Sequence, residues 1–249
     1  MQKIFVEEKN WNREQNIIKI TGEEVNHIKN VLRCKSSDKI EIKIMDNNEA
    51  NLPKFLCEIE KIEKEEIICK IIEEIESRNE SEIYLHIVQG IPKADKMEQI
   101  IEKGTELGVK EFTPFNLKRC IAKILPKEEE KKISRWQKIA ETAAKQSKRD
   151  LIPKVNKVYS IKNIFDLLKE YDIVIVAYED EKNLNLKDEL KNIKNNKTAK
   201  IALIIGPEGG IEKDEIETLK NMGAKVVSLG NRILRTETAR NCNCKCNNV

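Results

Sequence analysis

Short segments that partly alternate apolar with polar residues fill the first 75 positions of the chain. They are rich in β-branched residues, which is typical of strands. They cover residues 17–20, 39–45, 54–62 and 66–72. One stretch between them, residues 21–33, carries its apolar side chains at helical spacing. Several short strands with one helix predict a small β-barrel, and the polar stretch 73–81 predicts a linker.

Beyond this stretch, apolar strands alternate with amphipathic helices. The predicted strands cover 84–91, 111–115, 172–179 and 224–230, with an extended piece at 152–155 and a strand and turn at 200–210. The predicted helices cover 94–109, 127–148, 161–171 and 211–223. Such alternation predicts a parallel sheet of the α/β class. We therefore expect a β domain at 1–75 and an α/β domain at 76–249.

Composition and charge limit the classes of protein that the chain can represent. Charged residues make up 36% of the 249 residues and hydrophobic ones 39%, but the apolar residues come in blocks, which favours a folded chain. The net charge of +3 says little about nucleic acid. No segment is long enough to span a membrane, and the first residues do not form a signal peptide. The chain is therefore expected to be cytoplasmic.

The seven cysteines fall into two groups. Four are scattered singly, as expected of reduced thiols in the cytosol: Cys34, Cys57, Cys69 and Cys120. Cys242, Cys244 and Cys246 cluster near the end, with one residue between neighbours. Zinc knuckles usually place two residues between paired ligands, so this spacing does not favour a metal site.

The segment IALIIGPEGG, residues 201–210, is an apolar strand that runs into a glycine-rich turn. Ligands of open α/β sheets lie beyond the carboxyl ends of the strands, where glycines let the backbone approach them. The turn is neither a dinucleotide fingerprint nor a phosphate-binding P-loop, because neither motif is present. An ordinary joint between strand, turn and helix is the alternative interpretation.

A second glycine turn, SLGNRILRTETA at 228–239, also follows a predicted strand. The two turns are expected to form facing walls of one pocket, with Arg235 and Glu237 close to it. A buried arginine is costly unless it is paired or binds an anionic or polar ligand. A purely structural ion pair between Arg235 and Glu237 is the alternative.

Several long motifs, in this order and spacing, resemble the RsmE family of SPOUT-class RNA methyltransferases. They are HIKNVLR (27–33), KADKMEQIIEKGTELGVKEFTPF (93–115), RWQKIAETAAKQSKRDLIPKV (135–155), LIIGPEGGIEKDEI (203–216) and SLGNRILRTETA (228–239). The resemblance covers nearly the whole chain. It implies a PUA-like β-barrel followed by an α/β domain with a trefoil knot, and a homodimer. It also implies methylation of N3 of a uridine in small-subunit (16S) ribosomal RNA, free or in the assembled subunit, with S-adenosyl-L-methionine as the donor.

The resemblance also implies which residues form the site. The cofactor would be bound by Leu203, Gly206, Pro207, Glu208, Gly209, Gly210, Leu229, Gly230, Ile233, Leu234, Thr236 and Ala239. Uracil N3 must lose a proton before it can attack a methyl group. We expect Arg235 to neutralise charge on a uracil oxygen, and Glu237 to orient that arginine or to accept the proton.

Polar and basic residues in or near these motifs are the candidates for RNA contacts, because lysine and arginine hold phosphates. They are His27, Arg33, Lys93, Lys96, Arg119, Arg135, Gln146 and Arg149. Solvated surface is the alternative for any single lysine in a chain so rich in them. Trp136 and Phe115 are expected in the core rather than as base-stacking platforms.

The last ten residues, RNCNCKCNNV, depart from the family, which continues with a small apolar helix at this point. Shifted by one base, codons for such a helix produce a Cys–Asn alternation, so we expect a frameshift near codon 240. The altered tail places the knot, the dimer and the activity of this chain in question. The alternatives are a related methyltransferase with another RNA target and an RNA-binding relic without catalysis.

Overall fold

The computed structural model describes residues 2–46, 52–76, 79–181, 184, 186, 189 and 198–230. The chain divides into two compact units, Met1–Asn79 and Glu80–Val249. The boundary between them falls inside the stretch that the sequence predicts to be a linker. Part of that stretch is a strand instead, because β6 continues to Ile75 through backbone pairing with its neighbour.

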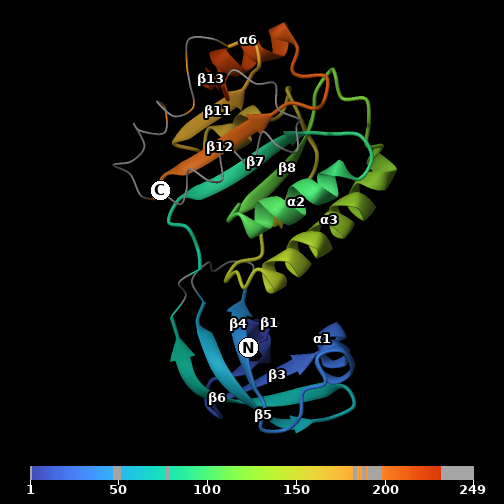
Figure 1. Cartoon of the computed structure of the whole chain (residues 1–249), viewed down its shortest axis with the longest axis vertical. Helices are drawn as coiled ribbons and strands as arrows, with labels where there is room; N and C mark the ends of the chain where they lie inside the picture. The colour runs from blue at the N-terminus through green and yellow to red at the C-terminus, as the bar shows by residue number, and fades with distance from the viewer. Residues whose placement is uncertain are drawn as a thin grey trace. The chain divides into compact units, whose positions relative to one another are not determined.

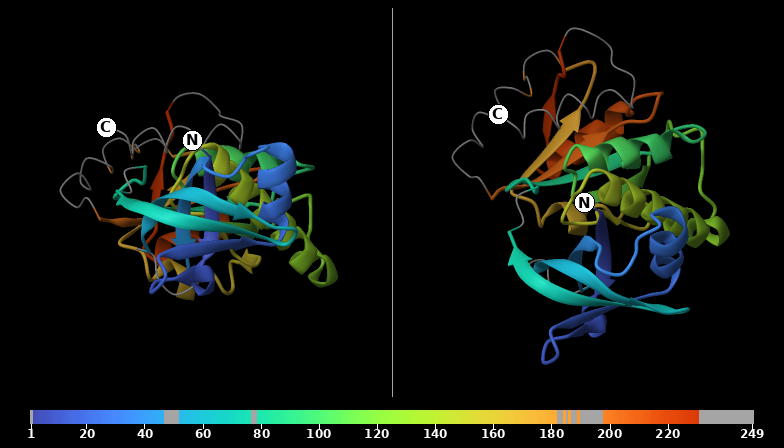
Figure 2. Two further views of the ribbon diagram at one scale, coloured as in Figure 1. Left: turned by 90° about the horizontal axis from the view of Figure 1, so that it is seen from below. Right: turned by 60° about the horizontal axis from the view of Figure 1, so that its bottom comes forward.

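The first unit is built on one six-stranded sheet with the order β1-β4-β5-β6-β3-β2. The strands are β1 (Lys3–Glu7), β2 (Trp11–Asn12), β3 (Ile17–Thr21), β4 (Lys39–Met45), β5 (Lys54–Ile62) and β6 (Glu66–Ile75). A 3₁₀ turn, Glu8–Asn10, follows β1. Helix α1 (Glu23–Asn26) continues as a π-helical turn, His27–Val31. Figure 2 shows the strong curvature of this sheet.

Alternation along the strands decides which face of this sheet is buried. Ile40, Ile42 and Ile44 of β4 point into the core, as do Ile18 and Ile20 of β3. Val25 of α1 and Ile28 of the π-helical turn are buried in the same core. The sequence predicts a small β-barrel. Among the described residues, β1 and β2 form the two edges, so the sheet is a half-barrel.

Strand β1, which the sequence pattern does not predict, pairs in parallel with β4 in the register Lys3↔Glu41. Only a strand far away in the sequence gives this segment its partner. Its short apolar run is followed at once by charged residues, so the local pattern was weak.

The second unit is a seven-stranded sheet with the order β10-β8-β7-β12-β11-β13, and β9 pairs with β8. Its strands are β7 (Tyr84–Gly90), β8 (Glu111–Asn116), β9 (Lys154–Val155), β10 (Tyr159–Ser160), β11 (Ile173–Ala177), β12 (Lys200–Ile205) and β13 (Lys225–Val227). Its described helices are α2 (Lys96–Glu106), α3 (Pro126–Gln146), α4 (Phe165–Leu168) and α6 (Lys213–Asn221). All of its strand pairs are parallel, which confirms the predicted α/β class.

Helices cover both faces of this sheet. Helices α2 and α3 pack side by side on one face (Figure 1), and Trp136 is buried there beside Phe112. Helices α4 and α6 contribute to the core of the other face, where Phe115 is fully buried. The core positions predicted for Trp136 and Phe115 are therefore confirmed. Because β12 lies between β7 and β11, its apolar side chains are buried on both faces.

One predicted helix is much shorter than expected. Only Phe165–Leu168 of the stretch 161–171 is α-helical. The backbone N–H of Ser160 donates to the side chain of Asn163 at 2.7 Å, and the backbone N–H of Ile164 donates to Ser160 O at 3.1 Å. These local bonds hold residues 160–164 in turns and delay the helix. Within the described part of the chain, no helix has the length and apolarity needed to cross a membrane.

Candidate cofactor-binding site

The turn GPEGG leaves the carboxyl end of β12 at Gly206 and leads into α6. The backbone N–H of Gly210 donates to Pro207 O at 2.9 Å, which closes a tight turn. Gly210 has a φ of +72°, a left-handed conformation that L residues rarely adopt. Helix α6 then begins with a capping box in which Glu212 and Glu215 each accept from the other's backbone N–H.

The neighbouring strand β7 touches this turn through its last residue. A Cβ atom on Gly90 would lie 2.6 Å from both the N and the Cδ of Pro207, so no larger residue fits there without moving backbone. The buried side chain of Gln89 donates from Nε2 to Gly206 O at 3.3 Å and to Gly90 O at 3.0 Å. These contacts fix the start of the turn against the sheet.

The carboxylate of Glu208, at the middle of the turn, is held by the segment that follows β7. The backbone N–H of Lys93 donates to both of its oxygens, at 3.2 and 3.3 Å. The ammonium of Lys96 lies 3.0 Å from Oε1. Burial opposes ionisation of Glu208, but these hydrogen bonds outweigh it and hold the pKa of the carboxyl below its ordinary value.

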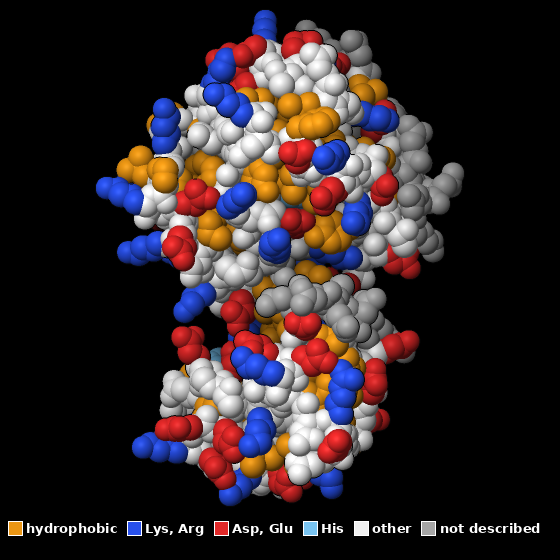
Figure 3. All heavy atoms as spheres, turned by 180° about the vertical axis from the view of Figure 1, so that it is seen from behind, with side chains coloured by type: hydrophobic (Ala, Val, Ile, Leu, Met, Phe, Trp, Pro, Cys, Tyr) orange, Lys and Arg blue, Asp and Glu red, His pale blue; other side chains and the backbone are white. Residues whose placement is uncertain are grey.

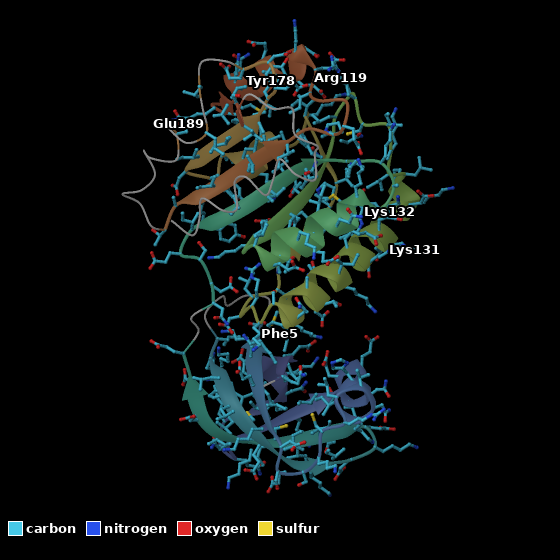
Figure 4. All side chains as sticks on the ribbon, viewed as in Figure 1. Phe5, Arg119, Lys131, Lys132, Tyr178 and Glu189 are labelled. Carbon is cyan, nitrogen blue, oxygen red and sulfur yellow. The ribbon has the colours of Figure 1, made fainter. Side chains whose placement is uncertain are left out.

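The segment that follows β8 holds the other end of the turn. Arg119 donates from Nε to Glu212 Oε1 at 2.8 Å and from Nη1 to Gly209 O at 3.0 Å. The backbone N–H of Lys118 donates to Glu215 Oε1 at 3.0 Å. The hydrogen bond from Arg119 lowers the pKa of Glu212. Figure 4 labels Arg119 close to α6, together with Tyr178 at the end of β11.

The second glycine turn begins at the end of β13. Leu229 packs against the core that α2 and α3 cover, and Gly230 has a φ of +108°. Both turns therefore leave the carboxyl edge of one sheet, with β11 between their strands. The remaining residues predicted in this turn lie outside the described residues: Ile233, Leu234, Arg235, Thr236, Glu237 and Ala239. The cysteines of the tail also lie outside them.

Leu203 occupies a different place from the other predicted cofactor residues. It is paired with Ile87 of β7 and Ile175 of β11, and only 1% of its surface is exposed. Its backbone belongs to the middle of the sheet, three residues before Gly206. The cofactor contact predicted for the backbone around Leu203 stays a prediction. Leu203 supports the strand that carries the turn.

Arg149, one of the predicted RNA contacts, is buried and engaged within the second unit. Its guanidinium forms an ion pair with Glu80 at 2.6 Å and donates to the carbonyl oxygens of Thr105 at 3.1 Å and Val109 at 2.5 Å. Only 3% of Arg149 is exposed. Because its donors face carbonyls at the end of α2 and the first residue of the second unit, Arg149 is a structural residue.

The other predicted RNA-binding residues lie on the surface. In the first unit, His27 and Arg33 are exposed. In the second, Arg135 pairs with Glu98 at 2.8 Å. Both Arg135 and Gln146 line an open groove of about 880 Å³ between α2 and α3. On the face shown in Figure 3, positive and negative side chains are interspersed rather than gathered into one basic stripe.

A second polar cluster lies at the opposite, amino edge of the same sheet, and sequence reasoning missed it. His86 is fully buried, with Nδ1 2.6 Å from Tyr171 Oη and Nε2 2.8 Å from Thr113 Oγ1. Tyr171 and Tyr84 both donate to Glu111 Oε2 at 2.9 Å. The hydroxyl proton of Tyr171 is donated to Glu111, so Tyr171 can only accept from His86. His86 therefore donates from Nδ1 to Tyr171 and accepts at Nε2 from Thr113.

Burial holds this histidine in its neutral form. Removal from water lowers the pKa of His86 to about 4; Glu111 opposes this shift and Lys154 adds to it. Asn156 completes the cluster by donating to Glu111 Oε1 at 2.5 Å and to Thr113 Oγ1 at 2.8 Å. A polar cluster this closed has no group directed at a ligand, so we assign it to stability.

The chemistry of the glycine turn limits what it can hold. A carboxylate, Glu208, stands at its centre, and Glu212 and Glu179 stand beside it. These charges disfavour a phosphate, which other glycine turns cradle. Gly206, Gly209 and Gly210 allow close packing of the turn against the chain itself, because an added Cβ would lie 2.9, 3.2 or 2.5 Å from neighbouring atoms. An uncharged nucleoside or a cationic group fits this environment.

Family comparisons agree with both units. A family model described as the RNA methyltransferase domain matches residues 79–245, and one described as the RNA methyltransferase PUA domain matches residues 20–72. The chain belongs to the RsmE family of RNA methyltransferases. The resemblance inferred from the motifs is thereby confirmed.

Relatives of the RsmE family match this chain over nearly its whole length. Ribosomal RNA small subunit methyltransferase E of Bacillus subtilis is 38% identical over 96% of this chain and 93% of its own length. The protein of the same name from Mesomycoplasma hyopneumoniae is 34% identical over 96% and 95%. A crystal structure of the Neisseria gonorrhoeae enzyme bound to S-adenosyl methionine has a TM-score of 0.81 and 26% identity, over 98% of this chain and 95% of that one.

Proposed function

We propose that this chain is an S-adenosyl-L-methionine-dependent methyltransferase that acts on N3 of a uridine in 16S ribosomal RNA. The observation that carries the proposal is the braced glycine turn at the carboxyl edge of the sheet, in a chain 38% identical to a ribosomal RNA small subunit methyltransferase E. The related structure with bound S-adenosyl methionine supports the choice of cofactor.

The residues of the turn fit this cofactor. When bound, S-adenosyl-L-methionine supplies an activated methyl group on a positively charged sulfur. The carboxylates around the turn favour a cationic ligand. An added Cβ on Gly206, Gly209 or Gly210 would lie 2.9, 3.2 or 2.5 Å from other atoms of the chain, so the glycines let the turn pack tightly and keep its shape. Gly230 begins the second wall of the proposed pocket. Hydrogen bonds from Gln89, Lys93 and Arg119 already hold the turn in place, so it would bind the cofactor without much reorganisation.

The chemistry on the RNA would depend on residues beyond Gly230. We propose that Arg235 neutralises the charge that develops on a uracil oxygen as N3 loses its proton, and that Glu237 orients Arg235 or receives the proton. We also propose that the last segment completes a trefoil knot and contributes to a homodimer. The first unit would hold RNA through exposed residues such as His27 and Arg33.

The decisive experiment is methyl transfer to purified small ribosomal subunits, followed by identification of the methylated nucleoside. We expect 3-methyluridine. A methyl group on ribose, or on transfer RNA alone, would replace the proposal with a different RNA target.

The unusual tail requires a matched pair of proteins in this assay. One protein ends in NCNCKCNNV, and the other carries the apolar sequence obtained by reading codons 240–249 one base later. Activity in the second protein alone would identify the chain that ends in NCNCKCNNV as an impaired member of the family. Resequencing the gene across codons 235–250 tests the proposed frameshift directly.

A further inference from the structure

Arg119 is held by the turn rather than extended into solvent. Two of its donors are engaged: Nε with Glu212 and Nη1 with the carbonyl of Gly209. Its stem also lies against Gly209, where an added Cβ would be 3.2 Å from the Cβ of Arg119. One side chain from the segment after β8 is thus hydrogen-bonded both to the turn and to Glu212, the N-cap residue of α6.

The charges around Arg119 also argue against an RNA phosphate as its partner. Glu212 and Glu179 both act on its guanidinium, and their charges raise the pKa of Arg119. A phosphate approaching from solvent would meet these carboxylates. The side chain is 43% exposed, so the groups around it, rather than burial, define its role.

We propose that Arg119 is a positioning residue for the cofactor turn rather than an RNA contact. Its forked donors hold Gly209 and Glu212 at a fixed separation, which keeps the backbone of residues 206–210 in the shape that binds the cofactor. This inference rests on the proposed function, because it assigns a ligand to that turn. It replaces the RNA-binding role that the sequence predicts for Arg119.

The test compares R119A, R119K and K123A by calorimetry with S-adenosyl-L-methionine and by RNA binding across a salt series. We expect R119A to raise the cofactor Kd about tenfold, because two charge-assisted hydrogen bonds are lost. R119K should recover only part of the affinity, since an ammonium cannot span both acceptors as a planar fork does. K123A removes a positive charge from the same segment and should leave the cofactor Kd unchanged.

RNA affinity and its salt dependence separate the two roles. A positioning residue leaves RNA affinity and its salt slope as in the unaltered protein, whereas loss of a phosphate contact weakens RNA binding and reduces the slope by about one. Weakened RNA binding with an unchanged cofactor Kd in R119A would overturn the inference. A double-mutant cycle with E212Q should be non-additive, because both changes break the same contact.

Hydrogen exchange provides a measurement that needs no ligand. The amide protons of Gly206 and of residues 208–212 should exchange faster in R119A than in K123A, with the remainder of the sheet unaffected. Equal exchange in the two variants would also overturn the inference. If the unaltered protein does not bind the cofactor at all, the proposed function fails, while the exchange data still show whether Arg119 orders the turn.

Discussion

The two edges of the seven-stranded sheet carry polar clusters of opposite character. At the amino edge, His86 and Glu111 form a closed network in which each described polar group is bonded to another side chain. At the carboxyl edge, Glu208, Glu212 and Arg119 are partly exposed and grip a backbone turn rather than one another alone. One edge thus carries a closed network that we assign to stability, and the other carries a turn that we propose binds the cofactor.

The difference follows from what each cluster encloses. The amino-edge cluster encloses only itself, so breaking it should change the free energy of unfolding and little else. The carboxyl-edge cluster holds the glycine turn that we propose binds the cofactor. Damage there should change ligand affinity more than stability. The predictions below test this separation, from the largest expected effect to the smallest.

The largest effect is expected from G90A at the carboxyl edge. The new methyl group would lie 2.6 Å from the backbone of Pro207 and would push the turn away from β7. We expect cofactor affinity to fall about a hundredfold by calorimetry, because small displacements of a binding turn are costly.

G108A is the matched control for this change. Gly108 has a positive φ, unlike Gly90, and nothing lies within 4 Å of an added Cβ. It should lower the free energy of unfolding by about 1 kcal/mol without changing affinity. Similar affinity losses in G90A and G108A would show that the contact between β7 and the turn is unimportant.

At the amino edge, stability should fall as the pH falls below 6.5. The pKa of His86 is about 4 in the folded chain and 6.5 in the unfolded one, so the unfolded chain binds the extra proton between these values. The stabilisation is complete above pH 6.5 and is lost progressively as the pH approaches 4, by about 3 kcal/mol in total. Urea unfolding at several pH values measures it.

A variant without the imidazole isolates this contribution from the many carboxylates that also titrate. H86Q should be less stable at pH 7, yet lose less stability than the unaltered chain between pH 6.5 and 4. Parallel pH profiles for the two proteins would mean that His86 is not kept neutral by burial.

The smallest effect is expected from E208Q at the carboxyl edge. The amide can still accept from the N–H of Lys93, but the charge that pairs with Lys96 is lost. Because this ion pair is partly exposed, the unfolding free energy should change by less than about 1 kcal/mol. Cofactor affinity should fall a few-fold through loss of a negative charge beside a cationic ligand. An affinity gain in E208Q would contradict this electrostatic assignment.

Particular elements show how far the sequence alone could be interpreted. Strands β4 and β5 have the predicted bounds, 39–45 and 54–62, because their alternation and their bounding polar residues are local signals. Strand β1 was missed because its pairing with β4 is remote in sequence. The predicted helix at 161–171 was too long, since Asn163 and Ser160 form turns that compete with it.

The predicted site divides in the same way. Glycine composition and position after an apolar strand were enough to select 206–210, and the motifs were enough to select the family. They were not enough to separate a surface arginine from a buried one. Arg149 and Arg119 were both predicted as RNA contacts, but Arg149 donates to carbonyls inside the fold and Arg119 donates to the backbone of the turn.

The sequence by itself determined the two units, the parallel class of the larger sheet and the turn that follows β12, because periodicity and glycine placement act over short distances. The tertiary structure decided the partners of every charged side chain near that turn. Gly90, Gln89, Lys93 and Arg119 lie far from residues 206–212 in the sequence, and parallel pairing of β8, β7 and β12 brings their carboxyl ends together. Folding brings these charged side chains together, and the sequence pattern does not indicate which of them become partners.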